Sequence, residues 1–240
     1  MTRVLVVQHE VECPPALVGE WLVEAGCALD VRHPYAGDDL PGLEGYDALL
    51  VLGGAMGAHD DEHLGWIGPT KELLRAATEQ GLPTLGICLG HQLVAAALGG
   101  RSEPNPLGQQ VGVLPVGWTE AAVRDPLFGP LATPRRGVQW NNDVVTALPP
   151  GATVLAATDR GEVQVARFGE AVWGVQHHPE VDAAIVATWV SDTERESLAG
   201  RGLDARELLA EIDAARAELE EAWRPLATGF AGLVRARTIA

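Results

Sequence analysis

The alternation of strand-like and helix-like segments in the first hundred residues constrains the fold more than any other feature. Four short apolar runs have the length and composition of buried strands: residues 3–8, 28–34, 46–54 and 83–88. Three segments have apolar residues at helical spacing: residues 14–26, 68–81 and 90–100. This alternation predicts the α/β class, with a mostly parallel central sheet flanked by helices on both faces.

The pattern changes after Gly100. Short runs broken by Gly, Pro and Asn predict an antiparallel β region over residues 101–175. From about Asp182 the pattern is helical, and Asp204 followed by Glu207 resembles a capping box. Pro225 predicts a kink or a break in the last helix. We predict one domain over 1–240, with a core of about 1–190 and a C-terminal helical extension of about 193–240, whose apolar stripe packs on the domain or on a partner subunit.

Charge and composition exclude several classes of partner. The formal net charge of -16 repels nucleic acid and anionic membranes. No apolar run approaches the roughly 18 residues of a membrane span, and we expect no signal peptide. The three cysteines, Cys13, Cys27 and Cys88, cannot all pair and none forms a CxxC motif. This usage predicts a reducing, cytoplasmic setting without disulfides.

Cys88 lies in the segment TLGICLGHQL, between a predicted strand and a predicted helix. Gly86 and Gly90 lack Cβ atoms, so strand and helix can approach closely around a sharp turn. The helix N-terminus then favours the thiolate of Cys88, and the N–H of Leu89 points to where an oxyanion would form. The alternative is a buried structural cysteine, which is our interpretation of Cys13 and Cys27.

The segment AVWGVQHHPEV singles out one of the seven histidines as a base. His178 precedes Pro179, which favours extended backbone, so His178 and Glu180 should face the same side. The carboxylate can then orient the imidazole. We expect His177 to point away, whereas His91 can face either the sheet or solvent.

Together, GICLGHQL, GVQHHPE and the glycine-rich LGGAMGAHDDE resemble the class I (triad-type) glutamine amidotransferases. Within that family the chain is most similar to the free-standing type related to the glutaminase domain of GMP synthase. The resemblance covers the chain from its start to about Glu180. It implies the flavodoxin-like fold of that family, with an antiparallel β region and a C-terminal helical extension, and no cofactor.

The resemblance also implies roles for individual residues. Cys88 would be the nucleophile, His178 the acid and base, and Glu180 its orienter. Gly54 and Leu89 would supply the N–H groups of the oxyanion hole. The remaining candidates would bind the substrate glutamine: Gly53, Gln92, Gln139, Trp140 and Asn141.

The chain departs from the family pattern at three places. Ala55 stands where the glycine-rich loop often has proline. No histidine occurs near Asn141 or Asn142, where relatives often carry one. His177 occupies a position that is usually aromatic. The last two departures bear on contacts with an acceptor or a regulator more than on glutaminase chemistry.

The predicted activity is hydrolysis of the side-chain amide of L-glutamine through a γ-glutamyl thioester. The chain has neither a GxxxxGK[ST] motif nor an SGGxD-like loop. An acceptor-activating synthetase subunit would therefore be a separate chain. One alternative is a stand-alone γ-glutamyl hydrolase or peptidase acting on another γ-glutamyl compound, and another is a non-catalytic binding or regulatory module on the same fold.

A metal site is a further alternative, in the segment HDDEH. His59 and His63 lie four residues apart there, with three carboxylates between them. Gly53, Gly54 and Gly57 disfavour the helix that would bring both imidazoles to one face. We therefore interpret the segment as an acidic, solvated loop and predict no metal.

Overall fold

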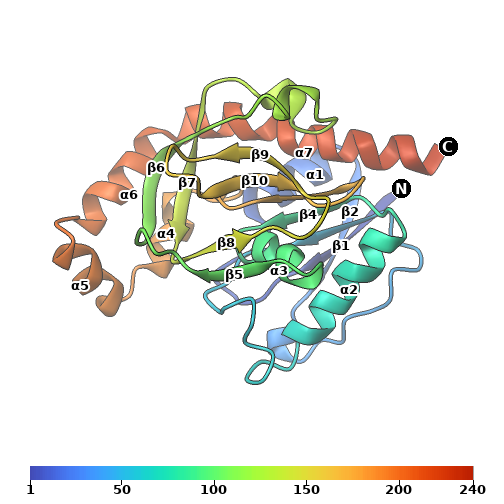
Figure 1. Ribbon diagram of the computed structural model, residues 1–240, viewed down its shortest axis with the longest axis horizontal. Helices are drawn as coiled ribbons and strands as arrows, with labels where there is room; N and C mark the ends of the chain where they lie inside the picture. Colours follow the sequence, from blue (N-terminus) through green and yellow to red (C-terminus); the bar gives the residue numbers. More distant parts are fainter. Residues whose placement is uncertain (240) are drawn as a thin grey trace.

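A seven-stranded sheet crosses the centre of the molecule in the order β2-β1-β3-β4-β11-β10-β9 (Figure 1). The computed structural model describes residues 1–239. The strands of this sheet are β1 (Thr2–Val7), β2 (Cys27–Arg32), β3 (Ala48–Val51), β4 (Thr84–Ile87), β9 (Thr153–Ala157), β10 (Val163–Arg167) and β11 (Val172–Val175).

Neighbouring strands from β2 to β11 pair in parallel, whereas β10 pairs antiparallel with both β11 and β9. Two further sheets are antiparallel pairs. One joins β5 (Arg101–Pro104) to β8 (Asp143–Ala147), and the other joins β6 (Gln110–Val116) to β7 (Arg135–Asn141). The predicted mostly parallel sheet with an antiparallel β region is confirmed.

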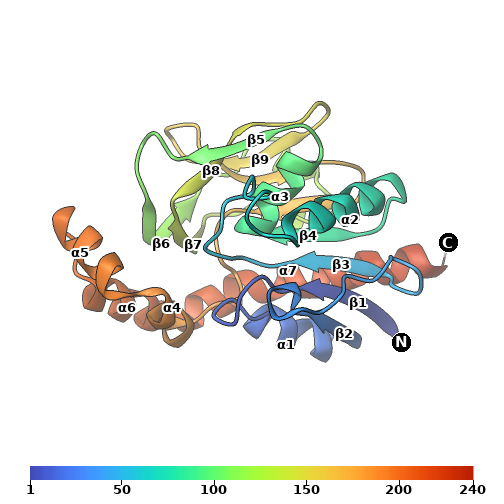
Figure 2. The same ribbon diagram turned by 90° about the horizontal axis from the view of Figure 1, so that it is seen from below.

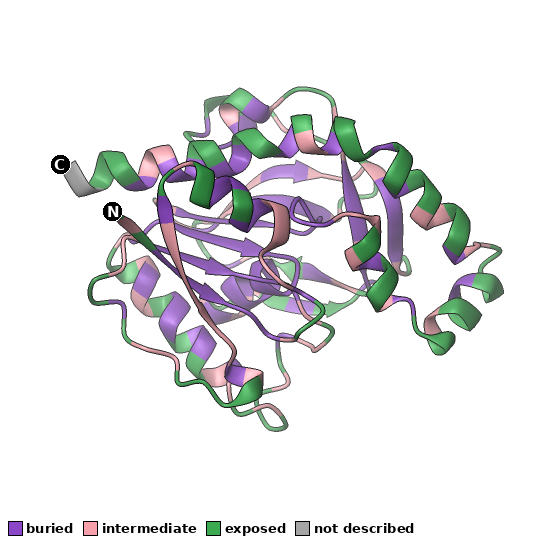
Figure 3. Ribbon diagram, turned by 180° about the vertical axis from the view of Figure 1, so that it is seen from behind, coloured by how far each residue is buried: buried purple, intermediate pink, exposed green. Residues whose placement is uncertain are grey.

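Helices cover both faces of the sheet (Figure 2). The helices α1 (Ala16–Glu24) and α7 (Arg216–Ile239) lie on one face, and α2 (Ile67–Glu79) and α3 (Leu89–Ala97) on the other. Strand β1 shows how the sequence builds two cores: Val4 and Val6 pack with α1 and α7, while Leu5 and Val7 pack with α2 and α3. Figure 3 shows the resulting buried sheet between helices with exposed outer surfaces.

Polar side chains cap the starts of three of the helices that follow the sheet. Side-chain oxygens of Asp182, Ser191 and Asp204 accept backbone hydrogen bonds at the starts of α4 (Ala183–Trp189), α5 (Asp192–Gly200) and α6 (Ala205–Ala214). The predicted cap at Asp204 is present, but its carboxylate accepts from the N–H of Arg206 instead of Glu207. The described residues also form three short 3-10 turns: η1 (Pro34–Ala36), η2 (Ala122–Arg124) and η3 (Gly129–Leu131).

The helix α7 returns along the sheet and packs against α1 and β7 (Figure 1). Trp223 and Phe230 on its inner face are fully buried, so its apolar stripe packs on the domain itself. The helix continues through Pro225, where the sequence predicts a kink or a break. A carbonyl of the preceding turn, that of Ala222, accepts a hydrogen bond from the Arg135 guanidinium. Among the described helices, none is both long and apolar enough to cross a membrane.

Candidate active site

The candidate residues converge at the carboxyl edge of the sheet, where β3, β4 and β11 end side by side. Gly53 and Gly54 follow β3, Cys88 follows β4, and His178 lies shortly after β11. Open α/β sheets place ligand sites at this edge, because the loops that leave parallel strands meet there. A cavity of about 450 Å³ opens at this point and is lined by Gly54, Cys88 and His178.

Cys88 occupies a strained turn. Its φ of 50° and ψ of -104° place it in a region that residues with a Cβ atom rarely adopt. Two backbone hydrogen bonds hold the turn: the Cys88 N–H donates to the carbonyl of Val175 (2.8 Å), and the Cys88 carbonyl accepts from Gln92 (3.1 Å). The thiol is therefore held at the start of α3, as the sequence predicts.

The two flanking glycines are required by close backbone approaches. A Cβ atom on Gly90 would lie 2.0 Å from the Val51 carbonyl oxygen, and one on Gly86 would lie 2.5 Å from the backbone of Gly90. Any side chain at either position would push α3 away from β3 and β4. The Gly-x-Cys-x-Gly spacing is thus a packing requirement of the turn.

His178 and Glu180 form a buried pair. His178 Nδ1 lies 2.7 Å from Glu180 Oε1, and the two side chains are 3% and 2% exposed. The extended backbone here is fixed by a hydrogen bond from the His178 N–H to Val138 (2.8 Å). Burial alone would lower the pKa of His178, but the Glu180 carboxylate and Cys88 outweigh it and raise that pKa to about 10. The pair therefore favours an imidazolium next to Cys88.

Two backbone N–H groups remain unengaged beside Cys88. Leu89 is the first residue of α3, so its N–H has no partner within the helix. Gly54 lies against it, since a Cβ atom on Gly54 would be 3.0 Å from Leu89 Cδ2. Neither N–H donates a hydrogen bond to any residue in the described part of the chain. Both are free to stabilise negative charge on a ligand.

The other candidates for substrate binding divide into two groups. Gln92, Trp140 and Asn141 line the cavity. Gln139 does not reach it, because its side chain lies in a buried polar cluster and donates to Gln164. Gly53 lies beneath the site, where a Cβ atom would be 3.2 Å from His178 Cε1.

Two further side chains, those of Gln176 and Trp189, contact Cys88 and His178 although the sequence predicts no role for them. Gln176 donates to Cys88 Sγ (3.5 Å) and accepts from Gln92 (3.3 Å). Trp189, at the end of α4, places its ring 4.7 Å from the His178 ring. Its indole N–H donates to the carbonyl of Glu12 (2.9 Å). Gln176 lies within the GVQHHPE segment but is not singled out there, whereas Trp189 is brought in by the fold and no local pattern marks it.

Cys13 lines the cavity, although the sequence suggests only a structural role for it. Its thiol donates to Glu10 Oε1 (3.2 Å). Burial and the nearby Glu10 carboxylate raise the pKa of the Cys13 thiol far above its ordinary value, so this cysteine stays protonated. Cys27 lies in the hydrophobic core.

Two other histidines near the site, His91 and His177, face away from Cys88. His91 packs on the sheet, where a Cβ atom on Gly174 would lie 2.4 Å from its Nδ1. The His177 ring packs 4.2 Å from that of Trp223, so it points away from His178 as predicted. Burial lowers the pKa of both histidines to about 3, which keeps both neutral.

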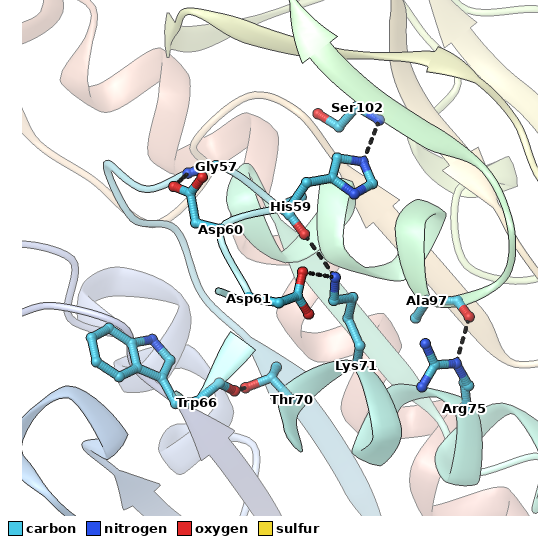
Figure 4. A network of polar contacts seen from close by, with 11 residues as sticks. Gly57, His59, Asp60, Asp61, Trp66, Thr70, Lys71, Arg75, Ala97 and Ser102 are labelled. Atoms are coloured by element: carbon cyan, nitrogen blue, oxygen red, sulfur yellow. Dashed lines mark hydrogen bonds and ion pairs between the residues drawn. The ribbon is translucent and has the colours of Figure 1, made fainter. Parts of the chain in front are cut away.

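The HDDEH segment forms a loop held by its own polar contacts (Figure 4). Asp60 accepts from the Gly57 N–H (2.7 Å), and Asp61 pairs with the Lys71 ammonium (2.6 Å). His59 accepts from the Ser102 N–H (3.4 Å). In the part of the chain that the structure describes, no group of three or more His, Cys, Asp or Glu is arranged to hold a metal ion.

The chain resembles known proteins over most of its length. Residues 17–185 match the family model for glutamine amidotransferase class-I. The glutamine amidotransferase-like protein YfeJ of Salmonella typhimurium is 29% identical over 204 residues, covering 83% of this chain and 84% of that protein. One of the subunits of the glutamine-hydrolysing GMP synthase of Halobacterium salinarum is 37% identical over 138 residues, covering 56% of this chain and 67% of that protein.

The same architecture occurs in a solved structure. The crystal structure of a glutamine amidotransferase from Thermotoga maritima superposes with a TM-score of 0.84 at 26% identity, covering 96% of this chain and 98% of that one. The family match covers most of the chain, and the fold agrees across nearly all of it. The chain therefore belongs to the class I glutamine amidotransferase family.

Proposed function

We propose that this protein hydrolyses the γ-carboxamide of glutamine through Cys88, His178 and Glu180. One observation carries the proposal. A cysteine on a strained turn and a histidine paired with a buried carboxylate at 2.7 Å open on one cavity. This arrangement supplies a nucleophile, a proton carrier and an orienting group, which together are sufficient for acyl transfer.

In the first step, the Cys88 thiolate attacks the carboxamide carbon and a C–S bond forms. The carbonyl oxygen takes up the negative charge, and the N–H groups of Gly54 and Leu89 stabilise it. Such a donor contributes about 3 kcal/mol to the transition state. The C–N bond then breaks as the His178 imidazolium gives its proton to the departing nitrogen, which leaves as ammonia.

In the second step, water hydrolyses the γ-glutamyl thioester. His178 is now neutral and takes a proton from the water as it attacks, and the C–S bond breaks to release glutamate. Glu180 acts on this cycle through His178, by fixing the ring and stabilising its charged form. The thiolate and imidazolium are restored for the next turnover.

The nitrogen product has two candidate fates. A relative in this family is named as one of the subunits of a GMP synthase, which favours transfer of ammonia to a synthetase on a separate chain. The cavity of about 450 Å³ is in the size range that binds drug-sized ligands. It therefore has room for a leaving amine larger than ammonia, and this favours a stand-alone γ-glutamyl hydrolase as the second candidate.

A substrate screen tests the proposal. Purified wild-type, Cys88→Ala and Cys27→Ala proteins are assayed on glutamine and on γ-glutamyl amides. The structure places Cys27 in the core, so its variant controls for loss of a cysteine as such. We expect Cys88→Ala to lose turnover and mass spectrometry to find a γ-glutamyl thioester on Cys88 of the wild type. Normal hydrolysis by Cys88→Ala would overturn the assignment.

A further inference from the structure

We propose that Glu10 is a positioning residue that holds the glycine-rich loop of the oxyanion hole in place. This inference rests on the proposed function. Glu10 lies in the loop after β1, and its Oε1 accepts a hydrogen bond from the Ala55 N–H (3.0 Å). Its own carbonyl accepts from the Gln8 side chain (2.8 Å), which anchors Glu10 next to the end of β1.

Few other hydrogen bonds hold the backbone of the loop after β3. The last ladder hydrogen bond of this strand runs from Leu52 to Val7 (3.0 Å). Beyond it, within the described residues, the backbone of residues 53–56 makes one hydrogen bond, that from Ala55 to Glu10. The next anchor is at Gly57, whose N–H donates to Asp60 (2.7 Å).

The hydrogen bond from Ala55 to Glu10 lies next to Gly54, whose N–H would stabilise the oxyanion. Gly54 has no Cβ, so its own backbone angles are weakly restricted. Fixing the peptide between Gly54 and Ala55 restrains Gly54 and hence the direction of its N–H. An oxyanion donor is effective when it is already oriented before charge develops. Glu10 thus links the β1 loop to the geometry of the transition state.

The substitution Ala55→Pro distinguishes positioning of the glycine-rich loop by Glu10 from a structural effect of Glu10 elsewhere. Proline lacks the N–H that Glu10 accepts, yet it restricts the local backbone through its own ring. In an Ala55→Pro background, Glu10 has lost its loop partner. Replacing Glu10 in this background should therefore lower kcat little further. The difference between the combined effect and the sum of the two single effects measures the coupling between the two residues.

The experiment compares wild type with Glu10→Ala, Glu10→Gln, Cys13→Ala, Ala55→Pro and the Glu10→Ala/Ala55→Pro double variant on the best γ-glutamyl substrate. We expect Glu10→Ala to lower kcat about tenfold, part of the effect of deleting an oxyanion donor, while KM changes less than about twofold. Glu10→Gln keeps an oxygen acceptor, so it should restore most of kcat. Thermal unfolding shows whether each variant is folded. Thioester trapping measures the fraction of active sites in each variant.

Three outcomes would overturn the inference. One is a folded Glu10→Ala variant with wild-type kcat. Another is full additivity of the two substitutions in the double variant. The third is an equal loss in Cys13→Ala, which would assign the effect to the thiol that Glu10 also accepts from. A wild type that is inactive on every substrate is a different result, because it refutes the proposed function itself.

Discussion

At the scale of single residues, Glu180 controls the charge of the site. It is buried beside His178, and its carboxylate, together with Cys88, outweighs the cost of burying an imidazolium. The raised pKa means that folding favours the protonated ring. This contribution to stability is fully present below the unfolded pKa of about 6.5 and is lost as pH rises through the folded value of about 10.

Glu180→Gln should therefore change both rate and pH dependence. Without the carboxylate, Cys88 alone opposes the cost of burial, so the pKa of His178 falls and less of the imidazolium that protonates the leaving nitrogen is present. We expect kcat at pH 7 to fall about 100-fold, within the range for general acid–base groups. In denaturant titrations, the wild type should lose stability from pH 7 to 10 more steeply than Glu180→Gln. Equal slopes would show that the pair does not set the protonation of His178.

The sequence marks the residues that motifs define and misses those that the fold assembles. Cys88 and the His178–Glu180 pair follow from glycine spacing and strand alternation, which are local rules. Glu10 and Trp189 reach the cavity from segments outside these motifs, and no local pattern points to them. Gln139 differs from its neighbours Trp140 and Asn141, which line the cavity, because its own side chain donates into a buried polar cluster.

At the scale of elements, the turn between β4 and α3 depends on the lack of a Cβ atom at Gly90. Gly90→Ala would place its Cβ 2.0 Å from the Val51 carbonyl oxygen. Because the obstacle is backbone, relief requires moving α3 away from the sheet. We expect a loss of about 3 kcal/mol in unfolding free energy, at the upper end for overpacking, together with loss of activity.

Gly232→Ala is the matched control, because Gly232 lies inside α7 and a Cβ there meets nothing within 4 Å. It should stabilise the protein by about 0.5–1 kcal/mol through helix propensity. Denaturant unfolding of both variants measures the difference. A Gly90→Ala protein as stable as wild type would contradict the close packing of the elbow.

Element boundaries follow from the sequence better than element partners do. Strand and helix alternation yields the parallel sheet, because apolar runs, prolines and glycines act locally. The path of α7 is a different case. Its apolar stripe fits either the domain or a partner, and only the contacts of Trp223 and Phe230 place it on the domain. The helix α7 likewise continues through Pro225, where the local rule for proline predicts a kink or a break.

At the scale of the whole molecule, the net charge is -16, and acidic residues also line the candidate site. The side chains of Glu12, Asp143 and Glu194 are among those that line the cavity. Within the described part of the chain, its lining includes no lysine or arginine. The potential at the entrance is therefore negative, and it acts on charged ligands before any contact forms.

This field should discriminate among γ-glutamyl amides by the charge of the leaving amine. We expect an amide whose amine carries a second cationic group to have kcat/KM about tenfold above one whose amine carries a carboxylate, since steering of this size is common. The ratio should shrink as ionic strength rises from about 0.01 M to 0.15 M, where the screening length falls from about 30 Å to 8 Å. Glu12→Gln removes one exposed charge at the cavity and should lower the ratio at low salt. Faster hydrolysis of the anionic amide at low salt would mean that local contacts, and not the overall field, select the substrate.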